Sequence, residues 1–376
     1  MPLWIDSVKT PDDISVDVLS EILNEDVVDY RLSPLGRGVL SNVQTLEVTL
    51  DEDTRTVQFI AKFRKEEIPL EDLFNVEGAF YHLIDKLEDI HAFPFRLTKA
   101  LATGTHWLLL EYISDDVTTL DVHQSCPMDQ FDDLIHRLAK MHEYCWIDSS
   151  NSTKTGEILN KYSNKLSAAP GAGQSLPTSA RKEQFKAAWP AVKKRLVSFF
   201  SSESLQRLDD VVDWIAAGER IDMIQASVEE KRYTLVHGDF HMGNMLLPKG
   251  IVGDVDGRPW LVDWSFSGIG NPSVDLVFFM AMNDITTEDA KRVLQDYYKV
   301  VKGRLSWDEF LGMFRLCLLN QFIILVCYDS LCRTMADSSI DDMAEVQHAH
   351  FDRVNARCAQ MILLYNFDCG DIIQVV

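Results

Sequence analysis

Two carboxylates and one carboxamide stand close together in one part of this 376-residue chain. Asp239 and Asn244 are five residues apart in "TLVHGDFHMGNMLL", a polar loop that follows a short β-like run. The overlapping stretch "NMLLPKGIVGDVDGRPWLVDW" has apolar residues on both sides of an Asp-Gly turn, which predicts a β-hairpin. Pairing of its strands would bring Asn244 near Asp263. Such oxygen ligands suit Mg²⁺, which commonly takes one or two protein carboxylates and completes its shell with phosphate and water.

A lysine and a glutamate form a second candidate pair. Lys62 lies in a run with β-like alternation, and Glu77 is the one charged residue on the apolar stripe of the helix expected next. A buried carboxylate without a partner is costly, so we expect Lys62 to pair with it. The alternative is that Glu77 lies at the edge of the stripe and reaches water. The stripe consists of Leu73, Glu77, Phe80, Ile84 and Leu87.

Two glycines precede the first expected strand, in "LGRGVLS" at residues 35–41. Gly36 and Gly38 would let the backbone approach a phosphate closely and point its N–H groups at it. A single Gly-x-Gly pattern is weak evidence, because an ordinary turn that leads into a strand has the same composition.

In chain order, these candidates match the successive needs of phosphoryl transfer. A glycine loop covers the phosphates, and a lysine that is oriented by a glutamate neutralises them. Asn244 and Asp263 would hold Mg²⁺, and Asp239 would orient the attacking hydroxyl. Chance can supply any one of these parts, but all six in this order are hard to obtain by accident. The sequence therefore predicts ATP and Mg²⁺ as cofactors.

The apolar period changes along the chain from two to between three and four, which predicts an α+β fold. Residues 1–112 are expected to form a small β-rich lobe, and residues 113–376 a larger, mostly helical lobe with a single hairpin. Residues 166–180, "LSAAPGAGQSLPTSA", have no period and are expected to form a lid or a disordered loop. The expected elements are a helix from Thr10-Pro11-Asp12-Asp13 to about Leu23, a hairpin of 43–50 with 55–63, a helix at about 70–89, a strand at 106–113, and helices at 131–146, 181–229 and 285–376.

Composition excludes some classes of partner. The net charge of −22 argues against nonspecific binding to nucleic acid or anionic membranes, both of which need a basic face. Seven cysteines lie far apart without a Cys-x-x-Cys pair, so neither a disulfide framework nor a zinc site is expected. The apolar segment "RLCLLNQFIILVCYDSL" is interrupted by Asn320 and Gln321 and is expected to be a buried helix, too short and too polar to span a bilayer. The first residues show no signal pattern, so we expect a cytoplasmic protein without membrane insertion.

With these motifs, the sequence resembles the aminoglycoside phosphotransferase and choline kinase superfamily, which has a bilobal, protein-kinase-like fold. "HGDFHMGNML" is similar to the catalytic loop of that family, and "LVDWSFSGIGNPSVDLVFF" to its metal-binding segment and the helix that follows. "HRLAKMHEYCW" resembles the helix ahead of the catalytic loop. The resemblance extends more loosely from about residue 30 to residue 285, and the glycine loop is its least specific part.

The resemblance implies a role for each principal candidate. Asp239 would be the catalytic aspartate, and Asn244 and Asp263 would be the Mg²⁺ ligands. Lys62 would bind the phosphates, with Glu77 as its partner.

Other residues would support the loop or contact the nucleotide. Asp275 would brace the catalytic loop through backbone hydrogen bonds, and His237 would do likewise as a structural residue. His142 and His241 are expected to be packing or loop residues. The residues expected at the nucleotide are Gly36, Gly38, Ser41, Lys62, Glu77, Glu111 and Ile113.

The short segment between Trp264 and Asp275, eleven positions apart, favours a small acceptor over a protein. The metal-binding motif is Asp-Trp instead of Asp-Phe-Gly, and no Ala-Pro-Glu follows, so there is too little chain for an activation loop. We expect transfer of the γ-phosphoryl group of ATP to a hydroxyl of an amino alcohol, an aminoglycoside, a sugar or a lipophilic alcohol. The alternative is a catalytically silent nucleotide-binding or scaffold protein on the same fold.

Overall fold

The computed structural model of this protein describes most of the chain. The described residues are 1–37, 41–50, 55–65, 71–87, 90–114, 116–119, 126–147, 154–162, 178–217, 219–230, 233–249, 257–336 and 342–365. The chain forms two compact units. Unit 1 comprises Met1–Thr119, Ile158–Ser167 and Met245–Ser267, and unit 2 comprises Leu120–Glu157, Ala168–Asn244 and Gly268–Val376. The lobe boundary expected between residues 112 and 113 stays a prediction.

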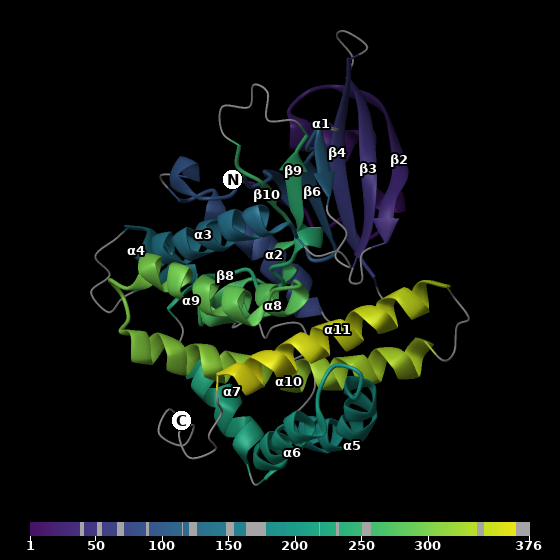
Figure 1. Cartoon of the computed structure of the whole chain (residues 1–376). Coiled ribbons are helices and arrows are strands. Elements are labelled where there is room, and N and C mark those ends of the chain that lie inside the picture. Colours follow the sequence, from purple (N-terminus) through teal and green to yellow (C-terminus); the bar gives the residue numbers. More distant parts are fainter. Residues whose placement is uncertain are drawn as a thin grey trace. The chain divides into compact units, whose positions relative to one another are not determined.

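A six-stranded sheet is the centre of unit 1, with the order β1-β5-β6-β4-β3-β2 (Figure 1). Only β1 and β5 pair in parallel; the other neighbours are antiparallel. The expected hairpin is formed by β3 and β4, with Leu50 opposite Arg55. The strands are β1 (Leu3–Trp4), β2 (Val27–Arg37), β3 (Ser41–Leu50), β4 (Arg55–Arg64), β5 (Ala100–Thr103) and β6 (Trp107–Glu111).

Successive residues of β4 point to opposite faces of this sheet. Phe59, Ala61 and Phe63 join the apolar core, to which α1 (Val16–Leu23) contributes Leu19 and other apolar residues. Lys62 lies between two of these residues in sequence and therefore points to the other face. There it meets Glu77 of α2 (Glu71–Ile84).

A second, three-stranded sheet of order β10-β9-β7 also belongs to unit 1. The antiparallel pair β9 (Met245–Pro248) and β10 (Trp260–Leu261) confirms the hairpin that was expected around the Asp-Gly turn. Gly257, in that turn, has a φ of +53°, which glycine adopts without strain. The sequence does not predict β7 (Val117–Thr119), because a strand of three residues is too short to show a period of two.

Helices form most of unit 2 (Figure 1). The longest of them, α10, packs against α5, α7, α8 and α11, and its Phe322 contacts Phe185 of α5. The buried carboxylate of Asp329 accepts hydrogen bonds from Arg195 and Arg333. The elements are α3 (Met128–Tyr144), α5 (Thr178–Leu196), α6 (Ser202–Ala216), α7 (Arg220–Glu230), β8 (Thr234–Val236), η3 (Met242–Asn244), β11 (Gly268–Gly270), α8 (Ser273–Met282), α9 (Thr287–Val301), α10 (Trp307–Ala336) and α11 (Asp342–Leu364), while α4 (Lys154–Tyr162) has residues in both units.

One stretch of α10, Trp307–Ser330, is long and apolar enough to cross a membrane by length and composition. The expectation that this helix is too short and too polar is therefore wrong, because the helix extends beyond the apolar segment that the sequence displays. In the structure, 89% of the most apolar window of this stretch is buried inside the fold, as in the core helix of a globular protein.

The first helix begins later than expected. Residues Pro11–Asp13 form a separate 3-10 turn, η1, in which the Asp13 carboxylate accepts the N–H of Thr10 at 2.8 Å. Ile14 then adopts extended backbone angles, and α1 begins at Val16 with Ser15 as its N-cap. The chain thus leaves and re-enters helical geometry within a few residues.

Other boundaries also differ from expectation. The helix α2 ends at Ile84 instead of about 89, because the N–H groups of Lys86 and Leu87 bond to carbonyls three residues back and tighten the chain. The helix α5 begins at Thr178, inside the loop expected at 166–180, and residues 166–177 lie outside the described part. The sequence predicts only one hairpin after residue 113, the one that β9 and β10 form, whereas the structure has a further antiparallel pair in unit 2, β8 and β11.

Gly104, between β5 and β6, leaves no room for a side chain. A Cβ atom there would lie 2.3 Å from the carbonyl oxygen of Ile5, which also accepts the indole N–H of Trp107. We expect Gly104→Ala to lower the free energy of unfolding by about 1–3 kcal/mol in urea denaturation, since the backbone must shift. Gly303→Ala is the matched control, because nothing lies within 4 Å of its Cβ position. Equal losses in the two variants would contradict the close approach.

Candidate active site

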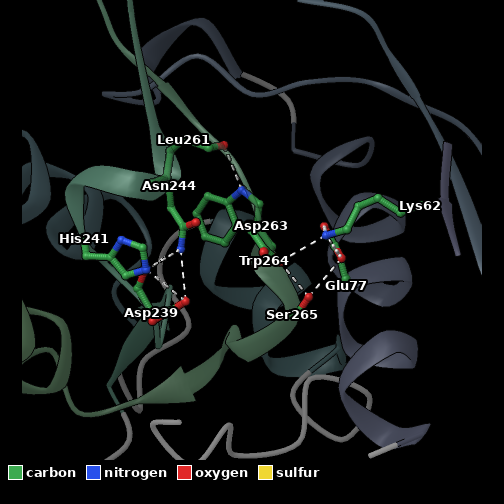
Figure 2. Close-up of polar contacts among 9 residues, drawn as sticks. All are labelled: Lys62, Glu77, Asp239, His241, Asn244, Leu261, Asp263, Trp264 and Ser265. Atoms are coloured by element: carbon green, nitrogen blue, oxygen red, sulfur yellow. Dashed lines mark hydrogen bonds and ion pairs between the residues drawn. The ribbon is translucent and has the colours of Figure 1, made fainter. Parts of the chain in front are cut away.

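Lys62 of β4 is buried between two carboxylates (Figure 2). Its Nζ donates to the two carboxylate oxygens of Glu77 at 2.9 and 2.7 Å, and to Oδ1 of Asp263 at 3.1 Å. Glu77 is fully buried, so the alternative in which it reaches water is wrong. The expected pairing of Lys62 with Glu77 is confirmed.

The charge of Lys62 is maintained by these neighbours. Burial by itself would lower the pKa of Lys62, because the ammonium group loses its hydration. The negative charges of Asp263 and Glu77 more than offset this effect and raise the pKa of Lys62 above its ordinary value. Lys62 is therefore a cation at neutral pH, with its Nζ held in one place.

Asp263 adopts an unusual backbone conformation just before the 3-10 turn η4 (Trp264–Phe266). Its φ of +62° and ψ of 70° lie in the left-handed region, which is unfavourable for a residue with a Cβ atom. The Ser265 hydroxyl lies 2.8 Å from Oδ1 of Asp263 and 3.0 Å from Oε2 of Glu77. Because a hydroxyl has one proton, Ser265 donates to only one of these carboxylates at a time.

The turn that carries Asp263 is anchored by an aromatic contact. Trp264 is fully buried and stacks on Phe80 of α2, with ring centroids 3.8 Å apart and an interplanar angle of 9°. Its indole N–H donates to the carbonyl oxygen of Leu261 at 3.1 Å (Figure 2). These contacts fix the turn against the helix that also provides Glu77.

In unit 2, Asp275 of α8 holds the loop that carries Asp239. Its fully buried carboxylate accepts the backbone N–H of His237 at 2.8 Å and that of Gly238 at 2.7 Å. The two successive N–H groups point at one carboxylate because Gly238 has a φ of +79°, which glycine adopts readily. The ring of His237 contributes as well, since its Nδ1 accepts the N–H of Asp239 at 3.3 Å.

His142 of α3 contacts the same carboxylate. Its Nε2 lies 3.1 Å from Oδ2 of Asp275, and its Nδ1 lies 2.5 Å from the hydroxyl of Tyr297 on α9. All three residues are fully buried. The sequence predicts only a packing role for His142, whereas the structure shows a polar contact with the residue beneath the loop.

Asp239 keeps 20% of its side chain exposed. The Nδ2 group of Asn244 donates to Oδ2 of Asp239 at 3.1 Å and to its carbonyl oxygen at 2.9 Å (Figure 2). Within the described part of the chain, Oδ1 of Asp239 accepts no hydrogen bond. One carboxylate oxygen of Asp239 is therefore held in place by its neighbours, and these contacts leave the other oxygen unused.

His241 also points at Asp239. The N–H of Gly243 donates to Nδ1 of His241 at 3.0 Å, which assigns the ring proton to Nε2. Nε2 lies 3.3 Å from Oδ2 of Asp239 and 3.3 Å from Nδ2 of Asn244. In this tautomer Nε2 of His241 is a donor, as is Nδ2 of Asn244. Neither nitrogen can accept from the other, so both donate to the carboxylate of Asp239. His241 is thus a donor to Asp239, which goes beyond the loop role that the sequence predicts.

The glycine-loop candidates are described only in part. Gly36 lies near the end of β2, opposite Val43, at a shift in the strand register. Gly38 lies outside the described residues. Ser41 is buried and is the first residue of β3.

The other two candidates lie at the end of β6 and just beyond it. Glu111 is the last residue of β6, and its side chain is exposed. Its backbone N–H donates to the carbonyl oxygen of Lys99 at 2.8 Å, and its carbonyl oxygen accepts the hydroxyl of Thr98 at 3.1 Å. Ile113 follows two residues later and is partly buried.

Each unit therefore holds one set of the predicted residues. Lys62, Glu77 and Asp263 meet in unit 1, and Asp239 and Asn244 meet in unit 2. The expected proximity of Asn244 to Asp263 stays a prediction.

Four residues around these sets make polar contacts that the sequence reasoning missed. Ser265 stands two residues after Asp263, and His241 stands two residues after Asp239. Their positions in the motifs could therefore have pointed to their contacts. His142 lies in the motif "HRLAKMHEYCW". No pattern in the sequence points to Tyr297, which is 155 residues away from its partner.

The sequence pattern of one protein family matches well over half of the chain. Residues 41–310 match the phosphotransferase enzyme family. The chain belongs to this family. The match confirms the resemblance to the aminoglycoside phosphotransferase and choline kinase superfamily, and the α+β fold class is as expected. None of the curated proteins is similar enough in sequence to count as a relative.

Several solved kinase structures are similar to this chain at low identity. The choline kinase LicA from Streptococcus pneumoniae is 14% identical with a TM-score of 0.48, covering 92% of this chain and 98% of that one. An ethanolamine kinase from Plasmodium vivax is 10% identical with a TM-score of 0.48, covering 90% and 84%. The streptomycin-ATP ternary complex of APH(2")-IIa is 16% identical with a TM-score of 0.43, covering 88% and 96%. All three scores are below 0.5, so membership of the family rests on the sequence match.

Removal of Lys62 should destabilise the protein more than removal of the whole pair. Lys62→Met leaves the buried Glu77 without its cation, and we expect a loss of about 3 kcal/mol or more in urea denaturation. In the double variant Lys62→Met/Glu77→Leu, no fully buried charge is left unpaired, because Asp263, which also loses Lys62, is 45% exposed, and part of this stability should return. Arg55→Ala, which removes an ion pair with Glu25 that is largely exposed, should cost less than about 1 kcal/mol. A Lys62→Met variant as stable as this control would contradict a buried, charged Glu77.

Proposed function

We propose that this protein transfers the γ-phosphoryl group of ATP, with Mg²⁺, to a hydroxyl group of a small molecule. The observation that carries the proposal is the match to the phosphotransferase enzyme family, because the matched segment, 41–310, includes the principal candidates. These are Ser41, Lys62, Glu77, Asp239, Asn244, Asp263 and Asp275.

Asp239 orients the acceptor hydroxyl and receives its proton. In a loose phosphoryl-transfer transition state the hydroxyl loses its proton late, and a carboxylate is too weak a base to remove it early. Asn244 and His241 hold Oδ2 of Asp239, which leaves Oδ1 to accept a hydrogen bond from the hydroxyl. As the hydroxyl oxygen forms its bond to the γ-phosphorus, the bond from that phosphorus to the bridging oxygen breaks, ADP leaves with that oxygen, and the proton passes to Oδ1.

Lys62 supplies positive charge for the phosphates. It remains a cation because Glu77 and Asp263 raise its pKa. Glu77 accepts two hydrogen bonds from Nζ, so the charge is held in position before the nucleotide arrives. A preorganised charge of this kind stabilises the charge of the transferring group without reorganisation during the reaction.

Asn244 and Asp263 would hold the Mg²⁺ ion. The amide nitrogen of Asn244 is used as a donor to Asp239, which leaves the amide oxygen as a ligand, and 45% of the Asp263 side chain is exposed. Asn244 is bonded to Met245, whose strand partner, Leu261, stands two residues before Asp263. Among the described residues, no group of three or more His, Cys, Asp or Glu side chains could hold a metal. An ion that relies on phosphate and water for most of its ligands does not need such a group. When bound, Mg²⁺ would neutralise charge on the phosphates.

The substitution Asp239→Ala tests the central assignment. We expect turnover to fall by at least about a thousandfold, an increase in the barrier of about 4 kcal/mol, because the hydroxyl loses both its orientation and its proton acceptor. Asp213→Ala, on the exposed face of α6, is the matched control and should keep the parent rate. Steady-state ADP release measures both. A rate for Asp239→Ala within tenfold of the parent rate would contradict the assignment of Asp239 as the catalytic residue.

Metal dependence provides a second test. EDTA should abolish ADP release, and added Mg²⁺ should restore it. In Asn244→Ala, the Mg²⁺ concentration for half-maximal rate should rise about tenfold or more, because one oxygen ligand is lost. An unchanged Mg²⁺ requirement in this variant would remove Asn244 from the ligand set.

The acceptor class is open to direct measurement. ADP release across a panel of amino alcohols, aminoglycosides, sugars and lipophilic alcohols, with mass spectrometry of the products, should reveal a phosphorylated hydroxyl. Nucleotide binding without turnover on any acceptor would favour the alternative, a catalytically silent nucleotide-binding protein. Transfer of phosphate to a peptide would favour a protein kinase.

A further inference from the structure

Tyr297 of α9 stands at the far end of a row of buried polar groups that leads to the loop of Asp239. Its hydroxyl lies 2.5 Å from Nδ1 of His142, and Nε2 of that ring lies 3.1 Å from Oδ2 of Asp275. Asp275 in turn accepts the backbone N–H groups of His237 and Gly238. The row therefore ends at the two residues that immediately precede Asp239.

The directions of these hydrogen bonds follow from the carboxylate. Both oxygens of Asp275 accept backbone N–H groups, so the carboxylate is the acceptor in this row and Nε2 of His142 carries the ring proton. In a neutral imidazole the other nitrogen, Nδ1, is then an acceptor, and the hydroxyl of Tyr297 donates to it. Burial, and after it the negative charge of Asp275, raises the pKa of Tyr297 well above its ordinary value, so the hydroxyl keeps its proton.

The packing around Tyr297 keeps its hydroxyl directed at His142. The tyrosine ring stacks on Phe310 of α10, with centroids 5.5 Å apart and an interplanar angle of 13°. It meets the ring of His142 edge-on at a centroid distance of 6.0 Å. The helices α3 and α9, which carry the two residues, pack against each other.

We propose that Tyr297 is a positioning residue for the reaction, which holds the ring of His142 in place and thereby maintains the hold of Asp275 on the catalytic loop. Without the hydroxyl, Nδ1 of His142 is a buried acceptor that has lost its donor at 2.5 Å. The ring can then tilt towards another partner, which moves Nε2 out of its present 3.1 Å contact with Oδ2 of Asp275. With that donor lost, the carboxylate shifts away from the N–H groups of His237 and Gly238.

The test compares Tyr297→Phe with Tyr298→Phe. The control removes a hydroxyl from the next residue of the same helix, where it donates to the carbonyl oxygen of Leu305 at 3.2 Å. We expect the N–H groups of His237 and Gly238 to exchange with solvent about tenfold faster or more in Tyr297→Phe, and at the parent rate in Tyr298→Phe. Nitrogen-15 NMR of labelled histidine should show a shifted Nδ1 resonance of His142, which reports the loss of its hydrogen bond, only in Tyr297→Phe.

Two further readouts separate this role from a general loss of stability. The N–H groups of α6 should exchange at the parent rate in Tyr297→Phe, because that helix packs against α5, α7 and α11, which carry no member of the row. In a His142→Leu background, Tyr297→Phe should add no further acceleration at His237 and Gly238, because its effect passes through the imidazole. Unchanged exchange in Tyr297→Phe, or an equal acceleration in the His142→Leu background, would overturn the proposal.

The link to turnover rests on the proposed kinase function. With an active acceptor, Tyr297→Phe should lower kcat about tenfold and leave KM for the nucleotide within about twofold, because Asp239 acts on the acceptor hydroxyl. An unchanged kcat would remove the positioning role. If the parent protein has no turnover with any acceptor, the proposed function fails, whereas the exchange and NMR results still decide whether Tyr297 controls the loop.

Discussion

A carboxylate that is removed from water needs donors or a cation at its oxygens, and the candidate residues in each unit of this protein are arranged around one such carboxylate. In unit 1 it is Glu77, and in unit 2 it is Asp275; both are fully buried. An unpaired buried charge costs several kcal/mol, which is a large part of the stability of a typical domain. Each of these residues therefore dictates which groups surround it, and the candidate catalytic residues are among its neighbours.

The two carboxylates are satisfied by different kinds of donor, with different consequences. Glu77 is paired with a side-chain cation, Lys62, so its burial fixes the position of a positive charge. The donors at Asp275 are instead the imidazole of His142 and two backbone N–H groups. Its burial therefore fixes the course of the main chain. The first arrangement holds a positive charge in place, and the second holds the geometry of a loop.

The candidate reactive residues differ from these supports in their exposure. Asp239 is 20% exposed and Asp263 is 45% exposed, as groups that meet a ligand must be. Exposure alone would leave their side chains free to rotate. Asn244 and His241 hold one oxygen of Asp239, whereas Lys62 and Ser265 hold Asp263. Each candidate is thus accessible and also restricted in direction, at little cost in desolvation.

Local patterns in the sequence determined the secondary-structure elements and the side-chain pairs between elements that are close in sequence. The period of two in β3 and β4 determined which face of the sheet receives Lys62, and the spacing of three and four determined that Glu77 lies on the buried stripe of α2. The meeting of Lys62 with Glu77 follows from these two periods, because only 15 residues separate them. The family motifs likewise pointed to Asp239, Asn244, Asp263 and Asp275, because each of these residues stands in a short segment whose neighbours along the chain are characteristic.

Tertiary structure alone decided the contacts between distant segments. A strand as short as β7 has no period of its own, and it forms because β9 provides an edge. The orientation of His241 depends on where the loop places the N–H of Gly243, which no spacing encodes. The contact of His142 with Tyr297 joins α3 to α9 across 155 residues. Side chains that far apart in sequence meet only when whole helices pack, because burial of apolar faces, and not any local pattern, sets their relative position.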